Sequence, residues 1–193
     1  MDAIETLMRE HRTIETVIDA LTAFTQEARR RGATARGELA RFVGFLSQYA
    51  DGVHHGKEEE ILFRTMAEHG FPTDGGPLAV MLAEHVRGRA LVAVLASATE
   101  GTAPWSDEDR RRIADAAAAY GALLRSHIHK EDAILYPMAE QHLPPQAMAE
   151  VDAACAARDA DPATAELVDR HAIVAEELVA THSRSLHTIE VHP

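Results

Sequence analysis

Apolar residues recur along the chain at alternating steps of three and four, which is the spacing of one face of an α-helix. Residues 2–31 carry the first such stripe, and Gly32 directly after it is a typical helix end. A second helix is predicted over residues 35–69. The Gly/Pro-rich run at 70–77 is predicted to connect it to a third helix at 78–100. The pattern therefore indicates a series of long amphipathic helices.

A fourth helix is predicted over residues 106–142, because Ser106 and Asp109 form a capping-box pattern before a new amphipathic stripe. The connections between these helices are short, so each helix is expected to pack antiparallel to the next. The predicted fold class is all-α: an antiparallel up-down-up-down four-helix bundle at residues 1–145 with a C-terminal helical extension at 146–193. The later predicted segments are a stop at 143–145, a weaker helix at 146–158, a break at 159–162 and a last helix to about residue 188.

An internal repeat divides the predicted bundle into two similar halves. Residues 54–63 read HHGKEEEILF, and residues 127–136 read HIHKEDAILY. Both copies contain a histidine followed four residues later by a glutamate, and the two pairs are His54 with Glu58 and His127 with Glu131. A pseudo-twofold arrangement of two helical hairpins would place equivalent side chains around two metal ions.

A second pair overlaps the first copy. His55 and Glu59 have the same spacing, but their counterparts in the second copy are Ile128 and Asp132. These two residues cannot form such a pair. The His54 pair is therefore the predicted ligand pair, and His55 is predicted to lie at the surface or behind the ligands. On this interpretation Glu59→Ala is expected to leave metal loading nearly intact.

The spacing of the repeated pairs suits metal binding. Residues four apart on a helix lie one above the other, about 5–6 Å apart at Cβ. An imidazole and a carboxylate so placed can reach one ion together, and the carboxylate can extend to a second ion. His11 and His85 add one imidazole each, because they lie on the apolar stripes of the first and third helices. The predicted metal ligands are His11, His54, Glu58, His85, His127 and Glu131.

Each part of this pattern also has an interpretation without metal. A single histidine on an apolar stripe is more often a hydrogen-bonded core residue, and a single His-x-x-x-Glu pair is more often a surface contact. The combination favours metal, because an unpaired carboxylate on a buried stripe, such as Glu131, costs on the order of several kcal/mol. Imidazole and carboxylate donors without thiolate suit Fe, Mn or Zn, and paired bridging carboxylates favour a redox-active dinuclear site such as one of iron, with Zn and Mn left open.

Composition narrows the function classes. The chain has 193 residues and a formal net charge of -12, which disfavours nucleic acid or an anionic membrane as a partner. A single cysteine, Cys155, leaves no internal disulfide and no multi-cysteine metal site. No apolar stretch is long enough to cross a bilayer, and the charged N-terminus is unlike a signal peptide. A soluble, cytoplasmic protein is expected.

Other polar residues are predicted to support the site or to face solvent. Glu15 and Arg89 follow His11 and His85 by four residues, and Tyr120 lies two turns before His127, so these three are candidates for a layer around the ligands. The run at 57–60 is otherwise predicted to be a solvated face. The histidines of the C-terminal extension have the same prediction, and they are His171, His182, His187 and His192.

On these residues the chain resembles the hemerythrin-like, or HHE cation-binding, family over roughly residues 1–142. The segments HHGKEEEILF and HIHKEDAILYP look like the two His-x-x-x-Glu helices of that family, and REH and AEH look like its two single-histidine helices. The resemblance implies a four-helix bundle that holds two Fe ions with an oxo or hydroxo bridge. It assigns as iron ligands His11, His54, Glu58, His85, His127 and Glu131.

The chain departs from the oxygen-carrying hemerythrins in two ways. Their fifth histidine lies four residues after the one on the third helix, where this chain has Arg89. Their last helix uses His-x-x-x-x-Asp, where this chain has His127-x-x-x-Glu131. Four imidazoles imply a more symmetric site with more than one open position, so simple oxygen storage is less expected. The resemblance favours the branch linked to nitric oxide or peroxide stress and to repair of iron–sulfur clusters.

Three functions follow as expectations. The first is a di-iron protein that binds or reacts with a small oxidant, namely O2, peroxide or nitric oxide, with turnover as an oxidoreductase left open. The second is a sensor or an iron donor that works with a redox or iron–sulfur protein partner. The third is a structural bundle in which Zn or Mn only adds folding free energy.

Overall fold

The computed structural model describes residues 2–182, and every regular element in this range is a helix. The all-α prediction is confirmed. The first element, α1 (Ala3–Arg31), begins where the Asp2 side chain accepts a hydrogen bond from the Glu5 amide at 3.3 Å. It ends at Gly32, whose φ of +64° is the left-handed conformation that glycine adopts most readily.

The second rod changes its helical type along its length. It consists of α2 (Arg36–Gly44), η1 (Phe45–His55), η2 (Glu58–Phe63) and α3 (Arg64–Glu68), and both η segments are π-helical. The backbone stays right-handed helical at the junctions, so the rod is continuous. A π-turn closes its hydrogen bond one residue later than an α-turn does, which rotates the following side chains around the rod.

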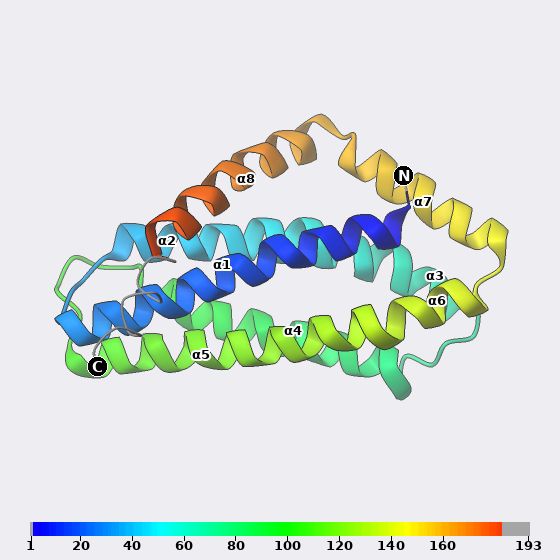
Figure 1. The fold of residues 1–193 in the computed structure, drawn as a ribbon. Coiled ribbons are helices and arrows are strands. Elements are labelled where there is room, and N and C mark those ends of the chain that lie inside the picture. Colours follow the sequence, from blue (N-terminus) through cyan, green and yellow to red (C-terminus); the bar gives the residue numbers. More distant parts are fainter. Residues whose placement is uncertain (1, 183–193) are drawn as a thin grey trace, which may run out of the picture.

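Two further rods complete the set predicted from the sequence. The capping box is confirmed, because the Asp109 amide donates to Ser106 Oγ at 3.1 Å and the Ser106 amide donates to Asp109 Oδ2 at 2.9 Å. Figure 1 shows the four rods lying lengthwise beside one another, with the chain reversing direction between successive rods. The elements of the third and fourth rods are α4 (Gly76–Ser97), α5 (Asp107–Lys130), η3 (Glu131–Leu135) and α6 (Tyr136–His142).

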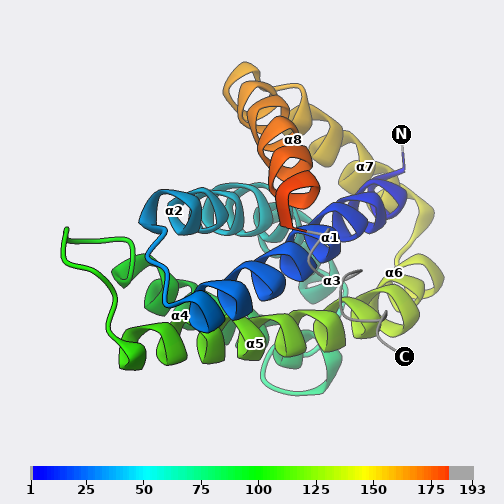
Figure 2. The same cartoon turned by 60° about the vertical axis from the view of Figure 1, so that its left-hand side comes forward.

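Two additional helices cover one side of these rods. Figure 1 shows α7 (Pro145–Asp159) and α8 (Pro162–His182) meeting at an angle above α1 and the second rod. In the turned view of Figure 2, α8 lies over α1 and the α2 end of the second rod. Contacts agree with the views, because α8 packs on α1 and η1 while α7 packs on α1 and η2. Among the described helices, none has both the length and the apolar content needed to cross a membrane.

The packing of α8 corrects one prediction. His171, predicted to be solvated, is only 5% exposed, and its Nε2 lies 3.1 Å from Gln48 Oε1. His182 is also partly covered, with its Nε2 2.8 Å from Glu38 Oε1. The weak apolar periodicity of this segment hid a narrow face that packs on α1 and η1. His187 and His192 lie outside the described residues.

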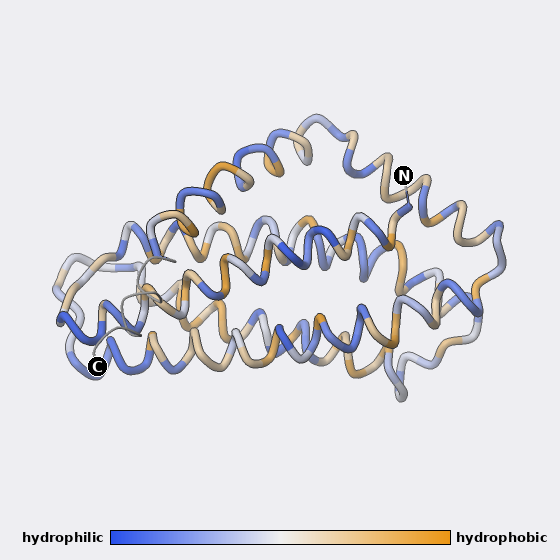
Figure 3. Tube along the Cα trace, viewed as in Figure 1, coloured by the Kyte–Doolittle hydropathy of each residue, from blue (hydrophilic) through white to orange (hydrophobic). Residues whose placement is uncertain are grey.

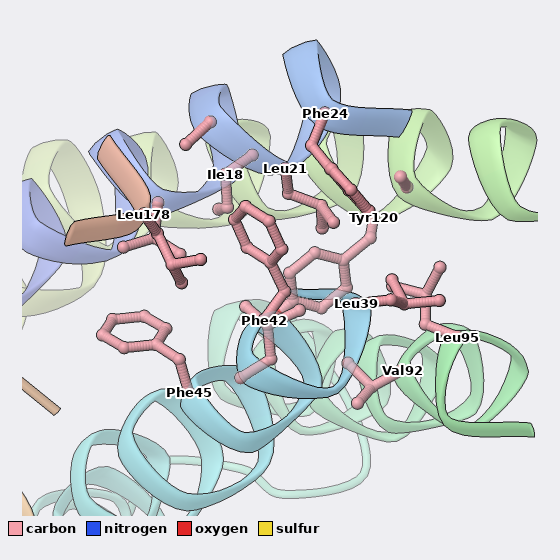
Figure 4. Close-up of a cluster of buried hydrophobic side chains, with 14 of the residues drawn as sticks. Ile18, Leu21, Phe24, Leu39, Phe42, Phe45, Val92, Leu95, Tyr120 and Leu178 are labelled. Carbon is pink, nitrogen blue, oxygen red and sulfur yellow. The ribbon is translucent and has the colours of Figure 1, made fainter. Parts of the chain in front are cut away.

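The core consists of two apolar clusters, one towards each end of the rods. Figure 4 shows part of the larger one, in which Phe24, Phe42 and Leu178 come from α1, α2 and α8. The smaller one is built from the N-terminal part of α1, η2, α3, α6 and α7 together with the start of α4. Hydrophobic and hydrophilic stretches alternate along every rod in Figure 3. On α1, the buried face passes from Leu7 in the smaller cluster to Ile14 in the larger one. The residue between them is His11.

Candidate metal centre

Six buried polar side chains from the four rods meet between the two apolar clusters. α1 and α4 each supply one histidine, whereas the second and fourth rods each supply a histidine and a glutamate. The exposed fraction of each side chain is 1% or less. The structure thus brings together the six residues predicted as ligands, which are His11, His54, Glu58, His85, His127 and Glu131.

The two glutamates each link imidazoles from different halves of the repeat. Glu131 Oε1 lies 3.1 Å from His127 Nε2, and Glu131 Oε2 lies 3.3 Å from His11 Nε2. Each carboxylate therefore lies close to two imidazoles, one from each half of the repeat. The equivalent distances from Glu58 Oε2 are 3.4 Å to His85 Nε2 and 3.6 Å to His54 Nε2.

The outer nitrogen of each imidazole is held by a second carboxylate. A carboxylate ion can only accept, so Nδ1 carries a hydrogen, and in the neutral ring Nε2 then presents a lone pair to the centre. Partners of this kind fix the ring orientation of metal-binding histidines and raise their basicity. The Nδ1 distances are 2.7 Å from His11 to Asp132, 3.0 Å from His54 to Glu10, 2.7 Å from His85 to Glu59 and 3.0 Å from His127 to Glu84.

The inner atoms are acceptors that face one another. His85 Nε2 and His127 Nε2 are 3.0 Å apart, and both rings already use their N–H on the outer carboxylates. Within residues 2–182, no donor satisfies Glu58 Oε2 or either carboxylate oxygen of Glu131. Acceptors that converge in a buried space repel one another unless a cation lies between them. The residues present therefore fit bound metal ions.

The pKa values of the buried groups follow from the same crowding. Burial, and then the charge of Glu131, raise the pKa of Glu58 well above its usual value. Burial alone would also raise the pKa of Glu131, but without metal the protonated rings of His11 and His127 outweigh it and hold the pKa well below the usual value. Burial and the neighbouring His11 lower the pKa of His54, which favours the neutral ring that binds metal.

The side chains fall into two groups, each of which could hold one ion. Within each group the ligand atoms lie within 4.8 Å of one another, and Glu58 belongs to both. Because Glu58 belongs to both groups, its carboxylate could contact an ion in either of them. The first group is His11, His54, Glu58 and Glu131, and the second is His55, Glu58, His85 and His127.

His55 in the second group corrects a prediction. A strictly α-helical reading turns His55 about 100° away from His54, towards the surface. In the π-helical segment η1, however, both histidines are buried, with exposed fractions of 5% for His55 and 1% for His54. Burial lowers the pKa of His55 to about 3, against an opposing hydrogen bond to Asp51, so its ring is neutral. Of the two positions predicted for His55, the one at the surface is therefore wrong, and the one behind the ligands stays a prediction.

Tyr136 is a site residue that the sequence argument missed. Its hydroxyl donates to Glu58 Oε1 at 2.5 Å and lies 3.5 Å from His11 Nε2, and its ring stacks on His11 at 5.7 Å between centroids. Its counterpart in the repeat is Phe63, whose ring stacks on His85 at 5.8 Å. Both repeat segments end in an aromatic residue, Phe63 and Tyr136, and this recurrence could have identified it from the sequence.

The layer outside the carboxylates is cationic, and its most buried member corrects another prediction. Lys57, predicted to face solvent, is fully buried. Its charge is paired there, since Nζ lies 2.5 Å from Glu10 Oε1 and 2.8 Å from Asp159 Oδ1. Asp159 belongs to α7, so the C-terminal helices reach the support of His54. In the other half, Lys130 pairs with Glu84 but stays 29% exposed.

The three residues predicted to surround the ligands, Glu15, Arg89 and Tyr120, lie in three different surroundings. Arg89 donates to Glu59 at 2.5 Å and to Asp51 at 2.8 Å, so it supports the carboxylate that holds one imidazole. Glu15 pairs with Arg12 at 3.0 Å near the surface.

Tyr120 packs in the larger apolar cluster and lines a pocket of about 190 Å³ between η1, α4 and α5. The wall of this pocket is mostly apolar, and Asp51 and Arg89 are its charged members. Of the candidate ligands, His55 alone lines the pocket within the part of the chain that the structure describes. His55 thus lies between the pocket and the other imidazoles.

Comparisons with known proteins point to the same chemistry. A profile of the hemerythrin HHE cation-binding domain matches residues 2–139. Uncharacterized proteins of Mycobacterium tuberculosis (strain H37Rv) and Mycobacterium bovis are each 27% identical over 138 residues, which cover 70% of this chain and 52% of the relative. The chain thus spans about half the length of these curated relatives. No solved structure matches it. The matched range contains all six converging side chains, and the chain belongs to the hemerythrin HHE cation-binding family.

Proposed function

We propose that this chain is a non-haem di-iron protein that binds or reacts with a small oxidant, namely dioxygen, peroxide or nitric oxide. The observation that carries the proposal is the convergence of buried imidazole nitrogens and carboxylate oxygens, of which Glu58 Oε2 and both oxygens of Glu131 have no hydrogen-bond partner among the described residues. Such a set is costly while it is empty and is neutralised by two cations that share the carboxylates. The proposed ligands are His11, His54, Glu58, His85, His127 and Glu131.

The proposed metal-binding unit is an antiparallel up-down-up-down four-helix bundle over residues 1–145. The proposed extension over residues 146–193 packs on one side of it. In this arrangement every rod contributes to the centre, so the metal ions and the bundle stabilise each other. The chain spans about half the length of its curated relatives, so any activity of the whole protein is proposed as well.

Iron is the proposed metal because the donors are imidazole and carboxylate without thiolate, and because two carboxylates are placed to be shared. Bound iron supplies Lewis acidity and one-electron redox chemistry at the centre. The outer carboxylates keep each Nε2 directed inward. The Tyr136 hydroxyl holds the carboxylate of Glu58 at 2.5 Å. These contacts pre-organise the donors before a ligand arrives.

The surroundings select for a small ligand. The apolar clusters close both ends of the centre, and the side chains that meet there have exposed fractions of 1% or less. A large or strongly hydrated molecule would have to displace these clusters. A diatomic molecule or peroxide can reach such a site through small side-chain movements, which supports the proposed ligand class.

The test is metal loading followed by exposure to each oxidant. The purified protein is loaded with Fe(II) without oxygen, iron is counted, and visible spectra are recorded after addition of O2, peroxide and nitric oxide. Two irons per chain and a new absorption band with one of these oxidants are expected. The variant His127→Gln should lose the band, whereas His129→Gln on the same helix, at an exposed position, should keep it.

Other outcomes would identify the competing functions. Two bound irons that leave rapidly to a chelator, without a reaction with any oxidant, would point to a sensor or to an iron donor for an iron–sulfur protein partner. Two zinc or manganese ions and no iron after growth in iron-replete medium would point to a structural bundle. Either result would overturn the proposed reaction with an oxidant.

A further inference from the structure

A pocket between η1, α4 and α5 reaches from the surface to the edge of the proposed centre. Its volume is about 190 Å³. The residues that line it include Ser47 and Ala93, which are exposed, and also Tyr120 and His55, which are only 2% and 5% exposed. The pocket is thus a recess that leads from solvent inward between the rods.

Small and apolar side chains create this space. Gly88, Val92 and Ala96 follow one another at steps of four on α4, so they share one face of that helix. Leu46 of η1 also lines the pocket. An apolar cavity of about 150 Å³ in another protein stays dry and binds xenon or benzene. A space of this size and lining therefore suits an apolar molecule.

The charged members of the wall are paired with each other. Arg89 Nε donates to Asp51 Oδ1 at 2.8 Å, and Arg89 Nη2 donates to Glu59 Oε1 at 2.5 Å. Asp51 also accepts from His55 Nδ1 at 3.1 Å. A peroxide molecule that entered would exchange its hydrogen bonds to water for few in return, and burying a polar group without partners is costly. A nearly apolar gas does not have this cost.

His55 connects the pocket with the proposed centre. Its ring stacks on that of His85, with centroids 3.8 Å apart and planes 19° apart, so it forms a wall beside this ligand. One of its ring nitrogens lies within 4.8 Å of the donor atoms of Glu58 and His127. A molecule in the pocket is therefore separated from the proposed ligands by the ring of one residue.

We propose that this pocket is a binding site for a nearly apolar diatomic gas, dioxygen or nitric oxide, from which the gas enters the centre past His55. The inference rests on the proposed function and narrows its ligand class, because an apolar wall does not concentrate peroxide. A second pocket reaches Tyr136, but carboxylates line it and keep it hydrated. They are Asp2, Glu5, Asp132 and Glu140.

Xenon tests the pocket independently of any reaction. Crystals of the protein as purified, placed under xenon pressure, should show xenon between Leu46, Val92 and Tyr120. Ala96→Leu fills the space and should abolish this binding. Ala90→Leu, at an exposed position of the same helix outside the pocket, should keep it. A pocket without xenon in the unchanged protein would overturn the proposal.

Stopped-flow spectra of the iron-loaded protein test the route. Ala96→Leu should slow the reaction with dioxygen or nitric oxide by about tenfold, since the gas must then displace side chains on its way. The rate with peroxide should not change, and Ala90→Leu should keep all rates. If Ala96→Leu does not fold, Gly88→Ala is a milder filling variant, because its added carbon would lie at an ordinary 3.6 Å from Tyr120 Cε2.

The outcomes separate this inference from the proposed function. A protein that reacts with peroxide and with neither gas would overturn the role of the pocket and leave the reactive centre standing. Gas rates that stay the same in the filled variant, or that fall together with the peroxide rate, would do so as well. Reaction with none of the three oxidants would overturn both proposals, whatever xenon does.

Discussion

At the scale of single residues, the two glutamates of the centre have pKa values shifted in opposite directions. Glu131 faces imidazoles through both of its oxygens, whereas Glu58 has one oxygen on the Tyr136 hydroxyl and only the other near imidazoles. In the protein without metal, burial and the charge of Glu131 therefore raise the pKa of Glu58. A bound cation has to displace this proton, so metal binding and the protonation of Glu58 oppose each other.

Glu58→Gln should change how the stability of the metal-free protein depends on pH. A raised pKa in the folded state stabilises the fold below the ordinary value of 4.5, and that contribution is lost as the pH rises towards the raised pKa. The free energy of unfolding of Glu58→Gln should thus rise, relative to the unchanged protein, by up to about 1.4 kcal/mol per pH unit in this window. Urea unfolding between pH 4.5 and pH 8 measures the difference, and parallel curves would contradict it.

Glu59 has a different role from the one that the repeat suggested. The sequence comparison predicts that Glu59→Ala leaves metal loading nearly intact, but Glu59 holds His85 Nδ1 at 2.7 Å. Loss of such a partner commonly weakens metal binding by about 10- to 100-fold. We now expect this loss for Glu59→Ala in a calorimetric Co(II) titration, with exposed Glu68→Ala on the same rod as the control. Equal affinities would restore the original prediction.

At the scale of elements, α7 distinguishes the two halves of the repeat. Arg158 on α7 donates to the carbonyl oxygens of Gly52 at 3.1 Å and Gly56 at 3.3 Å, beside the π-helical turn that positions the ligands. A Cβ atom at Gly56 would lie 2.5 Å from Arg158 Nη2, so a side chain there would push this cover away. The corresponding position in the second half is His129, which is exposed and has no such cover.

The same asymmetry predicts different costs for two equivalent lysines. Lys57→Met leaves Glu10 and Asp159 without their buried partner, and breaking a buried ion pair costs about 3–5 kcal/mol. Lys130→Met removes a pair that solvent reaches, which costs less than about 1 kcal/mol. Denaturant unfolding of the metal-free variants gives both values. Equal losses would mean that α7 does not shield its half of the centre.

At the scale of the whole molecule, the proposed centre joins all four rods, so metal should stabilise the fold globally. A ligand at about 100 times its dissociation constant adds roughly 2.7 kcal/mol to the free energy of unfolding. In a chain of this size that corresponds to a rise in Tm of about 5–10 °C. Calorimetry with and without Co(II) tests this. The shift should persist in His129→Gln and vanish in Glu131→Ala, and a shift that survives Glu131→Ala would place the metal elsewhere.

The sequence by itself determined the helices and the buried positions of the predicted ligands. Apolar stripes define which face of each helix is buried, so a histidine or glutamate on such a stripe must enter the core wherever the helices pack. The repeat then paired His54 with His127 and Glu58 with Glu131. These inferences use only local periodicity, and for that reason His11, next to Leu7 and Ile14, could be placed inside without knowing its neighbours.

Tertiary structure decided what lies between and behind those residues. The π-helical segment η1 places His55 on a buried face, whereas an α-helical count turns the ring outward. The contact between Lys57 and Asp159 joins positions far apart in the chain, so no local pattern announces it. The donor to Glu58 likewise comes from Tyr136 on another rod. Periodicity places a side chain on a face, but only the packed rods determine which atoms it meets there.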